Sequence, residues 1–219
     1  MDIIWDGITQ ADALNEAAVK MRHSLSDAAK SYDWPRVFEL LAQDISLVNT
    51  TRLNGTALYA PLHQVARGGA PVEIAQRLIG FGAWRTLQNA RGERPVDVAE
   101  RCGHRHLLKV LTPEHKRHVP IGVLLKIQAH FHAVIRGRID RELPDHRLRL
   151  PELEPLLELD QPEIWFPVPG MYGGFSYCLE STGVEAKLVS SSWCRVVGGS
   201  GQRHEVTSAG SQLVEEGFV

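Results

Sequence analysis

Apolar residues in the first half of the chain recur at spacings that predict pairs of short helices. In one such pair, Val72, Ala75, Leu78 and Ile79 fall at helical spacing and form one apolar face. The helix before it begins at Pro61, and proline suits the first turn of a helix because its missing N–H would have no partner there in any case. We therefore expect the first half of the chain to be helical.

The predicted helix pairs are copies of one repeat. Pro61 and Pro95 are 34 positions apart, and so are Gly69 and Gly103. The two glycines fall where the first helix of each pair must end in a left-handed residue. An earlier copy spans residues 27–41. A fixed period of this length is typical of proteins built from stacked repeats.

The motifs of these copies resemble ankyrin repeats. That family has Pro-Leu-His in the first helix, Gly-Ala after the second helix, and a finger that reads Asn-x-x-Gly. The matching segments here are Pro61-Leu62-His63, Gly82-Ala83 and Asn89-Ala90-Arg91-Gly92. The resemblance covers residues 25–111. It implies stacked helix pairs whose concave surface, made of fingers and first helices, holds a partner protein.

Three features depart from the family pattern. The threonine that usually precedes the proline and caps the helix is replaced by Ala60 in one copy and by Arg94 in the next. Residues 58–60 look like an insertion between the finger and the helix. Tyr32 stands where the first copy would have glycine. The helix boundaries of that first copy are the least defined by the sequence.

We assign the repeats to residues 24–118. The segments before and after them are expected to cover the two ends of the repeat stack. Residues 1–23 are predicted to form an N-terminal helical cap. Residues 119–162 are predicted to be a helix and a linker that pack on the last repeat, with a short helix at residues 152–159. The apolar face of the long helix is made of Leu124, Ile127, Phe131, Val134 and Ile135.

Residues 163–219 are predicted to form an antiparallel β-rich module. Pro169-Gly170 suits a tight turn, and strands are expected at residues 175–179, 184–189 and 193–197. The expected fold class is therefore α+β: a short α-solenoid of ankyrin repeats followed by a small β-rich module.

Composition and charge exclude several function classes. Lysine and arginine number 24 against 26 acidic residues, a net charge of −2, so a nucleic-acid binder or a ligand of anionic membranes is not expected. The sequence has neither a signal peptide nor an apolar run long enough to span a bilayer. Its three cysteines fit no disulfide framework or zinc motif. We expect a cytoplasmic protein.

Candidates for chemistry are few. His104 with His106, and His130 with His132, lie two positions apart, whereas helical metal pairs lie four apart, so no metal and no cofactor are expected. Another candidate is a nucleophile, base and orienting group made of Cys194, His204 and Glu205. The alternative interpretation, which we prefer, is that Cys194 packs inside a strand.

The resemblance places several arginine and aromatic side chains on the concave surface, types that are enriched where proteins bind each other. Arg67 and Arg101, 34 residues apart, are expected to form a positive strip for a partner with an acidic surface. Trp84 has a second interpretation, as a core residue. Tyr172 lies in a glycine-rich loop that is either a second binding loop or a set of tight turns. The candidate binding residues are Arg52, Tyr59, Gln64, Arg67, Trp84, Arg85, Arg91, Arg101 and Tyr172.

The function predicted from the sequence is protein binding without catalysis: the chain holds or neutralises another protein, such as a toxin or an effector. Two alternatives stay open. One is an enzyme whose site lies in the C-terminal half, with the repeats recruiting the substrate. The other is a scaffold that assembles with its own copies through exposed sheet edges.

Overall fold

The computed structural model describes residues 3–140, 147–195 and 200–217. It divides into two compact units. We call Thr9–Glu114 the helical unit, and Met1–Ile8 together with His115–Val219 the sheet unit.

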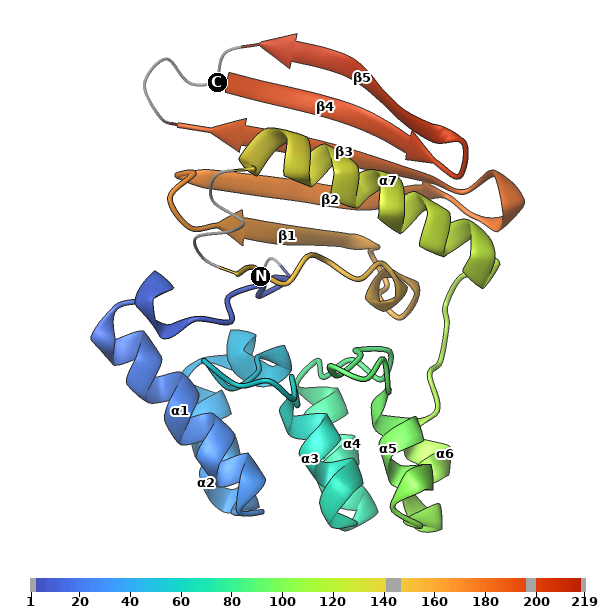
Figure 1. Ribbon diagram of the computed structural model, residues 1–219. Helices are drawn as coiled ribbons and strands as arrows, with labels where there is room; N and C mark the ends of the chain where they lie inside the picture. The colour runs from blue at the N-terminus through green and yellow to red at the C-terminus, as the bar shows by residue number, and fades with distance from the viewer. Residues whose placement is uncertain (1–2, 141–146, 196–199, 218–219) are drawn as a thin grey trace. The chain divides into compact units, whose positions relative to one another are not determined.

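The helical unit contains short helices that pack in pairs (Figure 1). Helix α1 packs against α2 and α3, α3 packs against α4 and α5, and α5 packs against α6. The elements are η1 (Ala11–Ala13), α1 (Glu16–Lys30), α2 (Trp34–Gln43), η2 (Ile45–Asn49), α3 (Pro61–Gly68), α4 (Val72–Gly80), α5 (Pro95–Arg101), η3 (Arg105–Leu107) and α6 (Leu108–Leu111).

The core of the helical unit is the set of apolar side chains that these helices turn toward one another. Burying such side chains contributes about 1.5–3 kcal/mol each relative to leaving them in water. Its fully buried members include Val37, Leu41, Val65, Ala66, Ala75, Leu78, Val98, Ala99, Leu107 and Leu111.

Side chains of the first turn accept hydrogen bonds from the residues that stand where the threonine caps of α3 and α5 would be. The backbone N–H of Ala60 donates to Nδ1 of His63, at 3.3 Å. The N–H of Arg94 donates to Oδ2 of Asp97, at 2.8 Å. Each pair lies three residues apart, which is the second half of a capping box: the N–H of the cap residue is satisfied, and no hydroxyl caps the first turn.

The first copy of the repeat tolerates Tyr32 because the residue adopts a left-handed backbone, with φ of 62°. Its ring packs directly on Gly68, where an added Cβ would collide with the ring carbons. Tyr32 thus takes the conformation that Gly69 (φ of 64°) and Gly103 (φ of 78°) take in the later copies.

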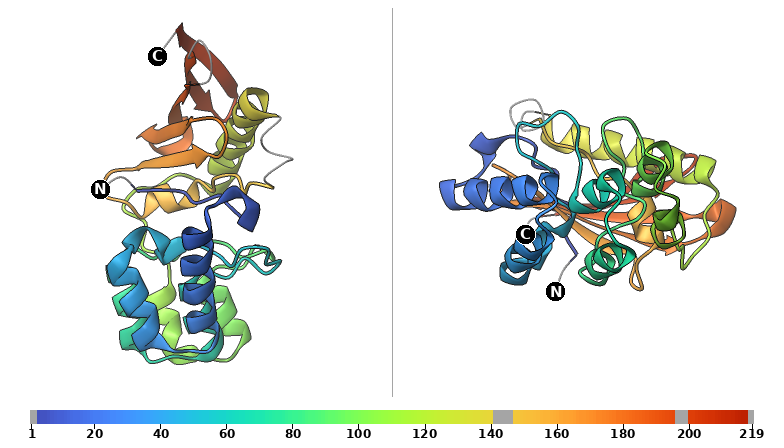
Figure 2. Two further views of the ribbon diagram at one scale, coloured as in Figure 1. Left: turned by 90° about the vertical axis from the view of Figure 1, so that its left-hand side faces the viewer. Right: turned by 90° about the horizontal axis from the view of Figure 1, so that it is seen from below.

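The sheet unit is an antiparallel meander of five strands in the order β1-β2-β3-β4-β5, with one long helix on it. Helix α7 (Ile121–Ile139) packs against β3, β4 and β5 and lies along one face of the sheet (Figures 1 and 2). The strands are β1 (Glu163–Val168), β2 (Gly173–Ser181), β3 (Lys187–Cys194), β4 (Ser200–Thr207) and β5 (Gly210–Gly217), and the short helices are η4 (Glu154–Leu157) and η5 (Gly183–Glu185).

The expected fold class, a short α-solenoid of ankyrin repeats followed by a small β-rich module, is wrong. The described residues form seven α-helices and a five-stranded antiparallel sheet, and the longest helix belongs to the sheet. Residues 119–162 belong to the sheet unit, whereas the last repeat belongs to the helical unit. The apolar face of α7 packs on the sheet, where the ring of Phe131 has its centroid 5.0 Å from that of Tyr177 and 6.4 Å from that of Phe175.

Two further expectations need correction. The short helix at residues 152–159 is a single 3-10 turn, η4. The strand expected at residues 184–189 begins only at Lys187, because η5 precedes it. The last two residues of the strand expected at 193–197 and the glycines that follow it lie outside the described residues.

Candidate functional site

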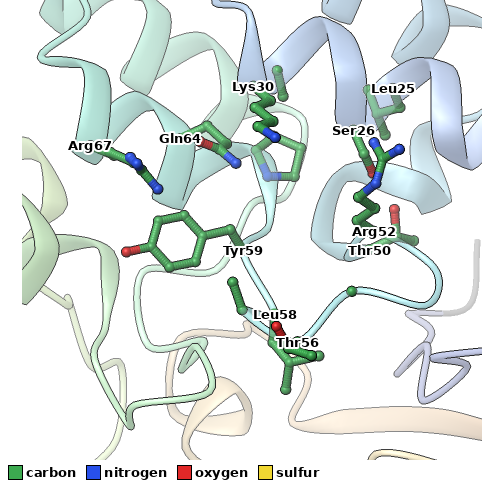
Figure 3. A pocket seen from close by; sticks show the side chains of 14 residues that line it. Leu25, Ser26, Lys30, Thr50, Arg52, Thr56, Leu58, Tyr59, Gln64 and Arg67 are labelled. Carbon is green, nitrogen blue, oxygen red and sulfur yellow. The ribbon is translucent and has the colours of Figure 1, made fainter.

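A pocket opens in the helical unit between α1, α3 and the loop that joins η2 to α3 (Figure 3). Its volume is about 240 Å³. The lining residues are Leu25, Ser26, Ala29, Lys30, Thr50, Arg52, Gly55, Thr56, Ala57, Leu58, Tyr59, Pro61, Gln64 and Arg67.

The charge of the pocket is one-sided. Three of its lining residues, Lys30, Arg52 and Arg67, are cations, and none is an acid. Arg52 is paired with Asp27, which lies outside the lining. Lys30 and Arg67 have no acidic partner in the part of the chain that the structure describes. The pocket is thus a local positive site on a chain whose net charge is −2.

Tyr59 forms one wall of the pocket because the backbone before it turns in an unusual way. Leu58 has φ of 52°, a left-handed conformation that side chains other than glycine rarely adopt. The Tyr59 ring then lies with its centroid 6.0 Å from the guanidinium carbon of Arg67 and 5.4 Å from the ring of His63. A guanidinium beside an aromatic face is held by cation–π attraction.

The hydroxyl of Tyr59 connects the pocket to α5. Nη2 of Arg101 donates to this hydroxyl at 3.1 Å. Arg101 also donates to both carboxylate oxygens of Glu93, at 2.6 and 3.2 Å. The hydrogen bond from Arg101, together with one from Asn89, holds the pKa of Glu93 below its ordinary value. The same carboxylate raises the pKa of the Arg101 guanidinium.

These contacts correct the expected positive strip of Arg67 and Arg101. The structure brings both arginines to Tyr59, but the charge of Arg101 is neutralised by Glu93. Helical phase predicted the shared surface. It could not reveal that Glu93, which lies before α5 in the sequence, forms an ion pair with the last residue of that helix.

Apart from Arg101, the candidate binding residues divide into two groups. Arg52, Tyr59, Gln64 and Arg67 line the pocket.

The remaining four residues do not belong to the pocket lining. Trp84 is only 5% exposed and is therefore not a surface residue. Arg85 donates to the carbonyl of Val110 at 2.9 Å, and Arg91 is an exposed loop residue outside the pocket lining. Tyr172 belongs to the sheet unit.

Sequence reasoning missed Lys30, Thr56 and Leu58 as parts of the pocket. The signal that could have found the last of these is the insertion at residues 58–60. A departure from a repeat pattern indicates a segment whose backbone does more than stack on the neighbouring repeat.

The glycine-rich loop at Tyr172 is explained by strand packing. Tyr172 lies between β1 and β2 and is 79% exposed. An added Cβ at Gly174 would collide with the indole of Trp165, which stacks on Trp193 with ring centroids 4.4 Å apart. An added Cβ at Gly173 would collide with the carbonyl of Trp193. Close approach of neighbouring strands therefore requires both glycines.

The proposed nucleophile and base do not come together. In the register of β3 and β4, Cys194 is opposite Ser200, whereas His204 is opposite Ser190. Four strand positions correspond to about 13 Å, well beyond hydrogen-bond reach. The thiol of Cys194 instead donates to the carbonyl of Met171, at 3.2 Å.

Three of the four histidines weighed as metal ligands contact backbone carbonyls. Nε2 of His104 lies 3.1 Å from the carbonyl of Arg67, and Nε2 of His106 lies 3.1 Å from that of Ala70. His132 lies 2.8 Å from the carbonyl of Pro151 in the same way. Within residues 3–140, 147–195 and 200–217, no three histidine, cysteine or acidic side chains gather as a metal site would require. None of the helices in those ranges is both long and apolar enough to cross a membrane.

No family model matches the chain, and no curated protein matches it. Among solved structures, one described as the Bd0816 predatory endopeptidase from Bdellovibrio bacteriovorus in complex with immunity protein Bd3460 is similar, with 31% identity. The match covers 40% of this chain and 43% of that chain, with a TM-score of 0.34. A TM-score this low does not show a shared fold.

Proposed function

We propose that this chain binds another protein through the helical unit, at the surface around Tyr59. The observation that carries the proposal is the pocket itself, which has three cations and no acid in its lining. Such a surface complements an acidic patch on a partner. The side chains that frame it, arginine and tyrosine, are the types that contribute most to binding between proteins.

The ankyrin resemblance of residues 25–111 supports the same surface, because that family holds partners on fingers and first helices. Tyr59 follows a finger, while Gln64 and Arg67 lie on α3, the first helix of its pair. The proposal is for a binder and not for an enzyme, and the distance between Cys194 and His204 supports this choice. A narrower form of the proposal is that the partner is a toxin or an effector that this chain neutralises or tethers.

The experiment compares the proteins captured from a lysate by the native chain and by two charge-reversal variants. Arg67→Glu changes the pocket, and Lys109→Glu makes the same change of charge on α6, outside the pocket lining. The proposal expects a protein that the native chain and Lys109→Glu both retain and that Arg67→Glu loses. Equal capture by all three forms would place the binding surface elsewhere on the chain.

A further inference from the structure

We infer that the pocket at Tyr59 receives the carboxylate of a glutamate or aspartate side chain, and that Arg67 is the group that recognises it. The inference rests on the proposed function and specifies the chemistry of the contact. Some polar groups of the pocket already have partners within the chain, and the remaining groups can bind a ligand.

Arg67 is the cation best prepared to bind a carboxylate. Arg52 is already paired with Asp27, and Arg101 is paired with Glu93. The guanidinium carbon of Arg67 lies 6.0 Å from the centroid of the Tyr59 ring, a cation–π contact that favours this position of the side chain, and its N–H groups have no acidic partner among the described residues. A guanidinium bonds a carboxylate through two parallel hydrogen bonds, and a side chain ordered in advance loses less entropy on binding.

Gln64 and Lys30 offer further donors to the same anion. Gln64 precedes Arg67 by three positions on α3, so the two side chains lie on one side of the helix. Lys30 is the last residue of α1, and its side chain lines the same pocket as Gln64 (Figure 3). No hydrogen bond to another described residue occupies either side-chain end. A carboxylate has about four acceptor positions and can use donors from all three residues.

The apolar part of the lining suits the stem of an acidic side chain. Leu58 and Thr56 form the wall opposite Lys30 and Gln64 (Figure 3). The methylene groups of glutamate can rest on such a wall while the carboxylate reaches the cations. Leu58 is held in a left-handed conformation, with φ of 52°, and backbone strain of this kind is concentrated at binding sites.

A phosphate group fits the pocket less well. Phosphate sites commonly use the free N–H groups at the start of a helix. The helix start that lines this pocket is Pro61, which has no N–H. The N–H of the preceding residue, Ala60, already donates to His63. The pocket therefore lacks the backbone donors of such sites and would have to hold a phosphate through side chains alone.

The test is a titration of the full chain, followed by NMR of the side-chain N–H signals of Arg67 and Gln64. The probes are acetyl-Gly-Glu-Gly-amide, its glutamine counterpart, a peptide whose only carboxylate is its C-terminus, and inorganic phosphate. We expect saturable shifts of both side-chain signals with the glutamate peptide, no such shifts with the glutamine peptide, and at least tenfold weaker binding to Arg67→Gln, about 1.4 kcal/mol. The control Lys109→Gln should bind as the native chain does.

Several results would overturn the inference. They are the absence of saturable shifts, equal shifts with the glutamine peptide, or tighter binding of phosphate or of the C-terminal carboxylate. Melting curves of both variants show whether a loss of binding reflects unfolding. If the peptide fails but Arg67→Glu still loses a captured protein, the proposed function stands without a carboxylate pocket. If the peptide binds but no such protein is found, the pocket stands and the proposed function fails.

Discussion

The hydroxyl of Tyr59 accepts a hydrogen bond from Nη2 of Arg101 at 3.1 Å, across 42 positions of the sequence. Tyr59 belongs to the segment that breaks the repeat pattern, and Arg101 ends the first helix of the next copy. The insertion is therefore bonded to the following helix pair. The ring of Tyr59 contacts Arg67, and its hydroxyl contacts Arg101. This arrangement gives the pocket a defined wall.

Removing only the hydroxyl of Tyr59 separates the contribution of its hydrogen bond from the contribution of its ring. Tyr59→Phe keeps the contact with Arg67 and loses the bond to Arg101, so we expect a loss of about 0.5–1.5 kcal/mol in the free energy of unfolding. Tyr59→Ala also removes the ring that orders Arg67, and it should weaken partner binding in addition. Urea unfolding of both variants measures the first effect. Equal stability of Tyr59→Phe and the native chain would show that the bond to Arg101 contributes nothing.

Charge reversal at Arg67 and at Arg101 should differ in its effect on stability. Arg101→Glu places a second carboxylate beside Glu93, so we expect a cost of about 1 kcal/mol or more, whereas Arg67→Glu should stay within about 0.5 kcal/mol of the native value. Melting curves of the two variants test the difference. The double variant Arg101→Glu with Glu93→Arg should recover part of the loss, and no recovery would argue against the ion pair as its cause.

Gly69 is required by both its backbone and its surroundings. Its φ is 64°, and an added Cβ would lie 2.5 Å from Nδ1 of His104. We expect Gly69→Ala to cost about 1–3 kcal/mol. Gly80, near the end of α4, has open space around it, and Gly80→Ala should be neutral or stabilising by up to about 1 kcal/mol. Thermal unfolding of this matched pair checks the prediction, which fails if the two substitutions have the same effect.

The sheet unit should lose stability in mild acid. Burial lowers the pKa of His132 below its ordinary value of 6.5, the contact with the Pro151 carbonyl opposes this shift, and the charge of Arg136 adds to it. Because the folded pKa lies below the unfolded one, the contribution of His132 is complete above pH 6.5 and is lost as the pH falls through that value toward the folded pKa.

His132→Gln keeps a donor for the Pro151 carbonyl and removes the titration. The melting temperature of this variant should therefore fall less between neutral pH and pH 5 than that of the native chain. Some dependence should remain, because burial and Arg138 also lower the pKa of His204. Identical pH profiles of the variant and the native chain would contradict the assignment to His132.

Local patterns predicted several elements of the fold, and contacts between distant segments explain the errors. Pro61 and Pro95 begin helices where the sequence placed them. The sequence indicated the apolar face of α7 but not the surface that this face covers, because the spacing of apolar residues in a helix does not identify the partner. Strand β5 was missed because its residues are almost all exposed and show no alternation.

The site was predictable only in part. Arg67 and Tyr59 followed from their types and positions, whereas the pairing of Arg101 with Glu93 and the left-handed turn at Leu58 depend on a backbone that no spacing encodes.

The most direct test of the account is the affinity of the captured partner for three forms of the full chain, measured by calorimetric titration. The forms are the native chain, Arg67→Glu and Lys109→Glu, each with a melting curve at the same pH and salt concentration. The account predicts that Arg67→Glu binds at least tenfold more weakly, a loss of about 1.4 kcal/mol, while Lys109→Glu binds as the native chain does. A folded Arg67→Glu variant that binds the partner with native affinity would contradict it.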